Sequence, residues 1–323
     1  MNIDINAKNG NPAANELGAE QMADVKDYFE LLKPSVMRLV VFTALVGLVV
    51  APGYIHPFTA FISILCIAIG AGSAGCLNMW YEHKIDALMS RTANRPIPSG
   101  RIKPDQALTF GILLMVGSVT MLGMLVNWFA AGFLAFTIFY YMVIYTMWLK
   151  PRTPLNIVIG GASGAFPPMI GYACVTGSIT IESLVLFLII FMWTPAHFWA
   201  LNLYIKRDYE KANIPMMPSV KGEPATRRQI LAYTYITAIC GLLPALLGFA
   251  GLLYASAALV LGFGFIYFAH QVHRHNSGDA ATKAAKNMFA FSLLYLMLLF
   301  TLLLAEHSFD ILVSFNLLNL IGL

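Results

Sequence analysis

Residues 57–101 read PFTAFISILCIAIGAGSAGCLNMWYEHKIDALMSRTANRPIPSGR, an apolar run that passes directly into a polar motif. The run from Pro57 to Leu77 contains about twenty apolar and small residues, which is enough to cross a bilayer as an α-helix. Polar and charged residues begin at Asn78. The stretch therefore predicts a membrane-spanning helix that ends in a polar motif.

Three potential metal ligands stand in that motif. Asn78, Glu82 and Asp86 are four residues apart, so on a helix that continues to Ala87 they share one face, about 6 Å apart along the axis. Oxygen ligands of this kind suit a hard divalent cation such as Mg²⁺, which binds carboxylates and keeps positions open for phosphate oxygens. The spacing favours a site that holds a diphosphate through Mg²⁺.

Basic residues follow the motif closely. Arg91, Arg95 and Arg101 could bind the same anion through forked hydrogen bonds. The alternative interpretation is a solvated helix end with a basic loop behind it. The spacing by itself leaves both interpretations open.

The motif has a counterpart in a known family. Asn78-x₃-Glu82-x₃-Asp86, followed by Arg91-x₃-Arg95-Pro, resembles the first aspartate-rich motif of the UbiA-type intramembrane prenyltransferases. It is similar, almost residue for residue, to the version in family members that farnesylate haem. The family usually has Asp where this chain has Glu82, which is also a hard oxygen ligand, so cation binding should persist with a changed coordination.

Composition places the chain in the membrane. Of its 323 residues 59% are hydrophobic and 11% are charged, which excludes a soluble globular class. Hydropathy predicts an all-α, polytopic membrane protein with nine transmembrane helices. These spans are expected at residues 35–52, 57–80, 106–127, 129–149, 154–175, 181–204, 228–250, 253–272 and 288–306.

The distribution of charge predicts the orientation. All 20 Lys and Arg residues fall in the N-terminal segment or in alternate loops, whereas the opposite side carries only Glu182, Glu306 and Asp310. The positive-inside rule then puts the N-terminus and the basic loops in the cytoplasm and the C-terminus outside. The net charge of +4 is thus a topology signal and no indication of nucleic-acid binding.

Three regions are expected along the chain: a disordered polar tail at 1–24, a transmembrane prenyltransferase domain at 25–310 and an apolar tail at 311–323. The first tail has no basic start and no apolar core, so it resembles neither a signal peptide nor a transit peptide, which favours a bacterial inner membrane. Before the first span, Lys33 and Arg38 are expected to face lipid headgroups. Four cysteines without C-x₂-C spacing are expected to be small core residues.

A second polar helix end is predicted four spans after the first. The resemblance carries Asp208 across as a further ligand of the cation, while Arg207 replaces a frequent Asp. It also assigns the basic turn with Lys150 and Arg152 to the diphosphate, although both residues equally continue the positive-inside pattern. The Gly/Ala/Ser run at 160–165 is expected to pack against other helices.

His197 follows Pro195 well inside a predicted span. A histidine in this position is either a hydrogen-bonded core residue or, because imidazole is a common axial ligand of haem iron, a residue that contacts haem. On a continuous helix it lies about 16 Å deeper than Asp208, too far from that carboxylate to reach the same diphosphate.

The resemblance implies an enzyme that joins farnesyl diphosphate to a vinyl group of haem B, with addition of water and with Mg²⁺ as cofactor. The implied partners are farnesyl diphosphate, haem B as substrate, the lipid bilayer and membrane proteins that handle haem O. The implied active site lies at the cytoplasmic end. Alternatives are a prenyltransferase for a quinone precursor or chlorin and, from another class, a membrane transporter; carriers, however, bind substrate near the midplane.

Overall fold

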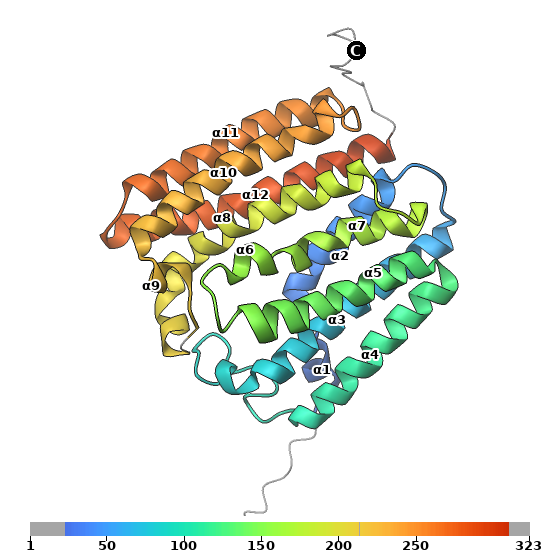
Figure 1. Ribbon diagram of the computed structural model, residues 1–323, viewed down its shortest axis with the longest axis horizontal. Helices are drawn as coiled ribbons and strands as arrows, with labels where there is room; N and C mark the ends of the chain where they lie inside the picture. The colour runs from blue at the N-terminus through green and yellow to red at the C-terminus, as the bar shows by residue number, and fades with distance from the viewer. Residues whose placement is uncertain (1–22, 213, 310–323) are drawn as a thin grey trace, which may run out of the picture.

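The computed structural model describes residues 23–212 and 214–309, and within them the chain is all-α (Figure 1). The helices are α1 (Val25–Leu31), α2 (Pro34–Val50), α3 (Pro57–Asp86), α4 (Pro104–Leu125), α5 (Trp128–Phe139), the π-helix η2 (Tyr140–Leu149), α6 (Asn156–Gly160), α7 (Ala162–Thr176), α8 (Ile181–Lys211), α9 (Met217–Val220), α10 (Glu223–Leu246), α11 (Leu252–Arg274) and α12 (Gly278–Ser308). The long helices run side by side in the view of Figure 1, and most of their connections lie at its two ends.

Eight spans in the described residues are long and apolar enough to cross a membrane. A ninth is obtained when α1 and α2, which meet at an angle of 57°, are counted as one broken span. Eight of the nine predicted transmembrane helices are therefore confirmed as long, apolar helices. The ninth is present only if α1 and α2 are counted as one span. The expected tails lie almost wholly outside the described residues, and the boundaries given for the three regions stay predictions.

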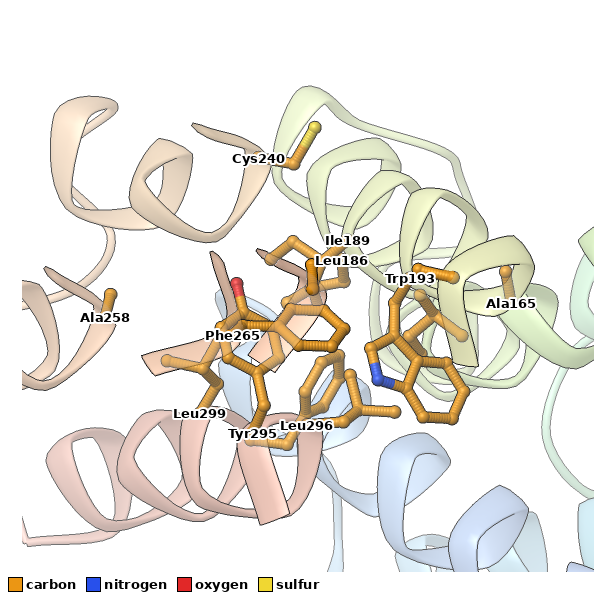
Figure 2. Packing of buried hydrophobic residues seen from close by; sticks show 14 of the residues in the cluster. Ala165, Leu186, Ile189, Trp193, Cys240, Ala258, Phe265, Tyr295, Leu296 and Leu299 are labelled. Carbon is orange, nitrogen blue, oxygen red and sulfur yellow. The ribbon is translucent and has the colours of Figure 1, made fainter. Parts of the chain in front are cut away.

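The largest hydrophobic core lies among α8, α10, α11 and α12. Figure 2 shows the side chains of Trp193 of α8, Phe265 of α11 and Tyr295 of α12 in this core. The rings of Phe265 and Tyr295 stack with their centroids 4.9 Å apart. All four cysteines are free and buried, as expected.

A second core holds α2 against α3, α5 and α7. Here α2 and α7 approach backbone to backbone: a Cβ added to Gly47 would lie 1.9 Å from the carbonyl oxygen of Pro168, and one added to Gly171 would lie 2.0 Å from that of Ala44. Small residues permit such close approach between membrane helices. This contact fixes the relative position of α2 and α7, which form two walls of the cavity described below.

Loops far apart in the sequence meet at one end of the bundle. The segment after α3 lies beside the end of α8 and the short α9 (Figure 1), where Met89, Tyr209 and Met216 form a small hydrophobic cluster. Ser90 donates its hydroxyl to both carboxylate oxygens of Asp208 at 3.0 and 2.9 Å. The two polar helix ends predicted from the sequence therefore come together.

Candidate active site

A cavity of about 310 Å³ opens between α2, α3, α5, η2, α7 and α8. One part of its wall is ionic and the remainder is mostly apolar, with a few neutral polar side chains. The ionic part contains four cations and two carboxylates, namely Lys33, Arg91, Arg95, Lys150, Glu82 and Asp86. The apolar part includes Val36, Val40, Ile67, Leu134, Ile138 and Ile170. A ligand with an anionic head and an apolar tail matches this division.

The predicted face of α3 forms one wall of the cavity. Asn78, Glu82 and Asp86 all line it, and each is only 3% exposed. The helix ends at Asp86, so the last of the three ligands stands where α3 passes into the basic loop. The four-residue spacing was therefore a correct guide to a shared face.

Each polar side chain of this face has a cationic partner. Lys150 donates to both oxygens of Glu82 at 2.5 and 2.7 Å, and Arg95 donates to Asp86 at 2.6 Å. The third cation, Lys33, donates to the amide oxygen of Asn78. Each of the three positions along this face of α3 is therefore contacted by a different cation.

The π-helix brings Lys150 to Glu82. In η2 the backbone N–H of Lys150 bonds to the carbonyl of Tyr145, five residues earlier, at 2.9 Å. Stretches of π-helix are frequent at functional sites. Tyr145 itself lines the cavity, and its ring lies so close to Gly160 that a Cβ there would be 2.0 Å away. Thr146, also in η2, accepts from the amide of Asn78 at 3.1 Å.

The small-residue run at 160–165 serves two purposes. Gly160 makes room for the ring of Tyr145, as expected for close packing. Ser163 and Gly164, however, line the cavity, and a Cβ on Gly164 would meet nothing within 4 Å. The expectation of helix packing therefore covers only part of the run.

Asp208 stands apart from the other predicted metal ligands. It bonds to Ser90 and is not among the residues that line the cavity, whereas its neighbour Tyr209 is. Ile205 has non-helical angles (φ −110°, ψ 16°), so the last turns of α8 change direction just before Asp208. Across residues 23–212 and 214–309, no three His, Cys, Asp or Glu side chains are close enough together to hold a metal ion.

The chemistry of the donors on α3 nevertheless fits Mg²⁺. Two carboxylates and an amide oxygen are hard ligands, and they lie buried on one cavity wall. A magnesium ion bound by few protein oxygens keeps positions for substrate phosphates. Asn78, Glu82 and Asp86 are therefore the residues that could hold it, with Asp208 at the rim.

Two predicted anion-binding cations are directed elsewhere. Arg152 donates to the carbonyls of Met147 and Trp148, at 3.2 and 3.0 Å, and stays exposed. Arg101 pairs with Asp27 of α1. Neither residue is among those that line the cavity, and both side chains hold helix ends and loops.

Lys33 is a cavity residue that the sequence interpretation missed. It was expected at the lipid headgroups, but it lines the cavity at the start of α2, whereas Arg38 is exposed. In the sequence, Lys33 followed by Pro34 indicates a turn at the start of α2, but it does not indicate that the lysine side chain enters the cavity.

His197 lies between α8 and α12, outside the residues that line the cavity. Its ring stacks between Trp193 and Phe289, with centroids 4.2 and 4.5 Å away, and its Nδ1 is 2.6 Å from the hydroxyl of Ser292. These contacts fix the plane and the hydrogen-bonded edge of the imidazole.

The fold and the site define a polytopic membrane protein with an intramembrane cavity for an anionic head and an apolar tail. Residues 40–310 match the model of the UbiA prenyltransferase family, and the chain belongs to this family. A protoheme IX farnesyltransferase of Rhizobium leguminosarum bv. trifolii is 61% identical over 292 residues, 90% of this chain and 92% of that protein. One of Parvibaculum lavamentivorans is 61% identical over 285 residues, 88% of this chain and 90% of that protein.

Solved structures share the fold. A UbiA homologue from Archaeoglobus fulgidus bound to DMAPP and Mg²⁺ superposes with a TM-score of 0.66 at 14% identity, over 86% of this chain and 99% of that chain. The same homologue bound to GPP and Mg²⁺ gives a TM-score of 0.63 at 14% identity, over the same shares. At this identity the likeness concerns the architecture.

Proposed function

We propose that this protein is a Mg²⁺-dependent intramembrane prenyltransferase. Its particular reaction is the transfer of farnesyl from farnesyl diphosphate to a vinyl group of haem B, with addition of water, to give haem O and diphosphate. The observation that carries the proposal is the cavity, whose ionic wall continues into an apolar wall. The farnesyltransferases that match at 61% identity support the choice of substrates.

The chemistry requires an allylic C–O bond to break, which leaves the electron pair on the departing diphosphate. The new C–C bond uses the vinyl π electrons, and water then adds to the neighbouring carbon with loss of a proton. When bound at Asn78, Glu82 and Asp86, Mg²⁺ would neutralise charge on the diphosphate. Arg91, Arg95 and Lys150 of this chain would bind the phosphate oxygens as their charge grows.

The apolar wall would hold the farnesyl chain and exclude water from the allylic cation until the acceptor reacts. The proposed role of Asp208 is to assist the cation site from the rim. The proposed role of His197 is to contact haem, because it is not among the residues that line the ionic wall and its ring is held by Trp193 and Phe289. No general base is assigned.

The proposed location is the bacterial cytoplasmic membrane, with the ionic end of the cavity facing the cytoplasm and the C-terminus outside. The one-sided distribution of Lys and Arg supports this orientation, and the matching relatives are bacterial. Such an enzyme would release haem O within the membrane, where proteins that handle haem O are the proposed partners.

The test is an incubation of the purified protein in detergent with radiolabelled farnesyl diphosphate, haem B and Mg²⁺. We expect the pigment to gain the mass of one farnesyl group and one hydroxyl group, with an equal amount of diphosphate released. A pigment of unchanged mass would reject the proposed acceptor, and label transfer to a quinone precursor or a chlorin would identify another one. Release of diphosphate only in the presence of Mg²⁺ separates an enzyme from a transporter.

A further inference from the structure

A ladder of stacked rings joins α8 to α12. Trp193 stacks on His197 with ring centroids 4.2 Å apart, and His197 stacks on Phe289 of α12 at 4.5 Å. Phe289 meets the ring of Tyr204 edge-on at 6.2 Å, and the ammonium of Lys286 lies 5.8 Å from the centroid of the Tyr204 ring. This ring ladder therefore contains one imidazole and ends at a cation.

Ser292 determines which nitrogen of His197 carries the proton. The Ser292 hydroxyl lies 2.6 Å from the carbonyl oxygen of Phe289 and 2.6 Å from Nδ1 of His197. A carbonyl only accepts, so the single hydroxyl proton belongs to that bond, and Nδ1 must donate to the serine oxygen. The hydrogen-bond network thus assigns the tautomer, in which Nε2 is unprotonated and has a lone pair.

The second nitrogen of His197, Nε2, is available to a ligand. In residues 23–212 and 214–309 it forms no hydrogen bond, and it is not one of the buried polar atoms that lack a partner. It is therefore an accessible atom of a half-buried side chain. A neutral imidazole whose other nitrogen donates a hydrogen bond is the form that ligates a metal, because that bond fixes the tautomer and the orientation of the ring.

Lys286 supplies a positive charge at the other end of the ring ladder. It is exposed, it lies two residues before the span predicted at 288–306, and it forms no ion pair with a carboxylate in the part of the chain that the structure describes. Its neighbour Tyr204 comes seven residues after His197, so the two stand on one face of α8, about 10 Å apart along the axis. The cation is thus about two helical turns from the imidazole.

Haem B, the proposed acceptor, has groups that match this separation. Its iron lies at the centre of an apolar macrocycle, and its two propionate carboxylates project from one edge. A site for it needs a metal ligand in an apolar region and a cation one ring radius and one propionate arm away, which a separation of about 10 Å along α8 provides. The charges are complementary, because a lysine ammonium pairs with a carboxylate.

We propose that α8 and α12 form the acceptor site, where Nε2 of His197 ligates the haem iron and the Lys286 ammonium binds a propionate. The inference rests on the proposed function and specifies where its acceptor binds. Ser292 is a positioning residue that keeps the lone pair of Nε2 free for the iron. Phe198, the residue after His197, lines the cavity, so a porphyrin bound here borders the place proposed for the prenyl chain.

The experiment compares Lys286→Met and His197→Ala with wild type, and uses Lys283→Met as the matched control because Lys283 is also an exposed cation of α12. Three probes separate the two contacts: haem B, its dimethyl ester, which has no free carboxylate, and protoporphyrin IX, which has no iron. Absorbance titrations in detergent measure the Kd of each porphyrin, and the Soret band reports the iron ligand. Calorimetry measures the Kd of Mg²⁺–farnesyl diphosphate separately.

We expect Lys286→Met to raise the Kd of haem B about 10-fold, the low end for loss of a charged hydrogen bond because the lysine is exposed. The dimethyl ester should bind wild type and Lys286→Met alike. His197→Ala should weaken haem B and shift its Soret band, while the Kd of protoporphyrin IX stays within about twofold of wild type. Lys283→Met should bind all three porphyrins as wild type does, and the Kd of farnesyl diphosphate should be unchanged in every variant.

Ser292 is tested with a conservative pair. Ser292→Ala removes the acceptor of the Nδ1 proton, whereas Ser292→Thr keeps the hydroxyl. We expect Ser292→Ala to raise the Kd of haem B about 10-fold, the low end when the hydrogen bond behind a metal-binding histidine is removed, and to leave protoporphyrin IX unaffected. Ser292→Thr should bind both as wild type does. Equal losses for both porphyrins in Ser292→Ala would overturn the positioning role.

Two results would overturn the acceptor site. One is wild-type affinity for haem B in Lys286→Met, or an equal loss for haem B and its ester. The other is an unchanged Soret band in His197→Ala. If either occurred while wild type still farnesylated haem B, the proposed function would stand without this site. A wild-type protein that shows the expected binding contrasts but transfers no farnesyl would keep the site and reject the proposed function, and a wild-type protein that binds no haem would reject both.

Discussion

Replacement of Glu82 tests whether the carboxylate itself is needed for the reaction. In Glu82→Gln the charge is lost but the shape is kept, whereas Glu82→Asp restores the residue that is usual in similar proteins and shortens the side chain by one methylene. We expect Glu82→Asp to keep kcat/KM within tenfold of wild type. We expect Glu82→Gln to lower it by about 10²- to 10³-fold, the loss typical when one charge-stabilising group is removed.

Glu82→Gln also acts on stability, because Lys150 is its partner. The two side chains are 4% and 16% exposed, and removal of one member of a buried pair costs about 3–5 kcal/mol. Lys150 keeps some contact with solvent and the glutamine oxygen still accepts a hydrogen bond, so we expect a loss of about 2 kcal/mol. The loss of stability and the loss of activity therefore need to be separated.

The double variant Glu82→Gln/Lys150→Met separates them. It removes the unpaired charge, so its Tm should recover toward wild type, whereas its activity should stay low. The assays are the mass of the haem product over a Mg²⁺ titration and thermal unfolding in detergent. Equal activity of Glu82→Gln and wild type at limiting Mg²⁺ would refute the reasoning, because it would show that a neutral amide at position 82 supports the reaction as well as the carboxylate does.

Three further predictions concern other parts of the molecule. His197→Ala should weaken haem binding, seen as a changed Soret band, and leave the affinity for farnesyl diphosphate nearly intact, whereas Asp86→Ala should do the reverse. Reporter fusions at Gly177 and after the last residue should both report the outside of the membrane. Gly47→Ala should lower stability by about 1–3 kcal/mol, because its Cβ would meet the backbone of α7, while Gly132→Ala, with nothing within 4 Å, should not.

The contrary outcomes are equally definite. Loss of farnesyl diphosphate binding with an unchanged haem spectrum in His197→Ala would return this residue to a purely structural role beside Ser292. Cytoplasmic signals from both fusions would reverse the orientation. Equal thermal stability of the two glycine variants would mean that α2 and α7 can separate without cost.

Much of the fold could be predicted because membrane helices are specified locally. Runs of about twenty apolar residues and the break at Pro34 determine where helices begin and end, and these signals need no knowledge of tertiary contacts. The bent pair α1 and α2 is the exception. Hydropathy predicts a complete span at α2. In the structure α2 has only 17 residues and follows the left-handed Lys33, so it counts as a membrane span only when it is joined to α1.

The sequence by itself determined the ligand face of α3, since the period of the α-helix places Asn78, Glu82 and Asp86 in one row wherever the helix packs. Only the tertiary structure decided which cations meet that row. Lys150 reaches Glu82 through a π-helix, Lys33 reaches Asn78 through a strained turn, and Arg152 folds back on its own helix end. The physical reason is that a basic side chain within a loop can satisfy its charge in several directions, and long-range packing selects one of them.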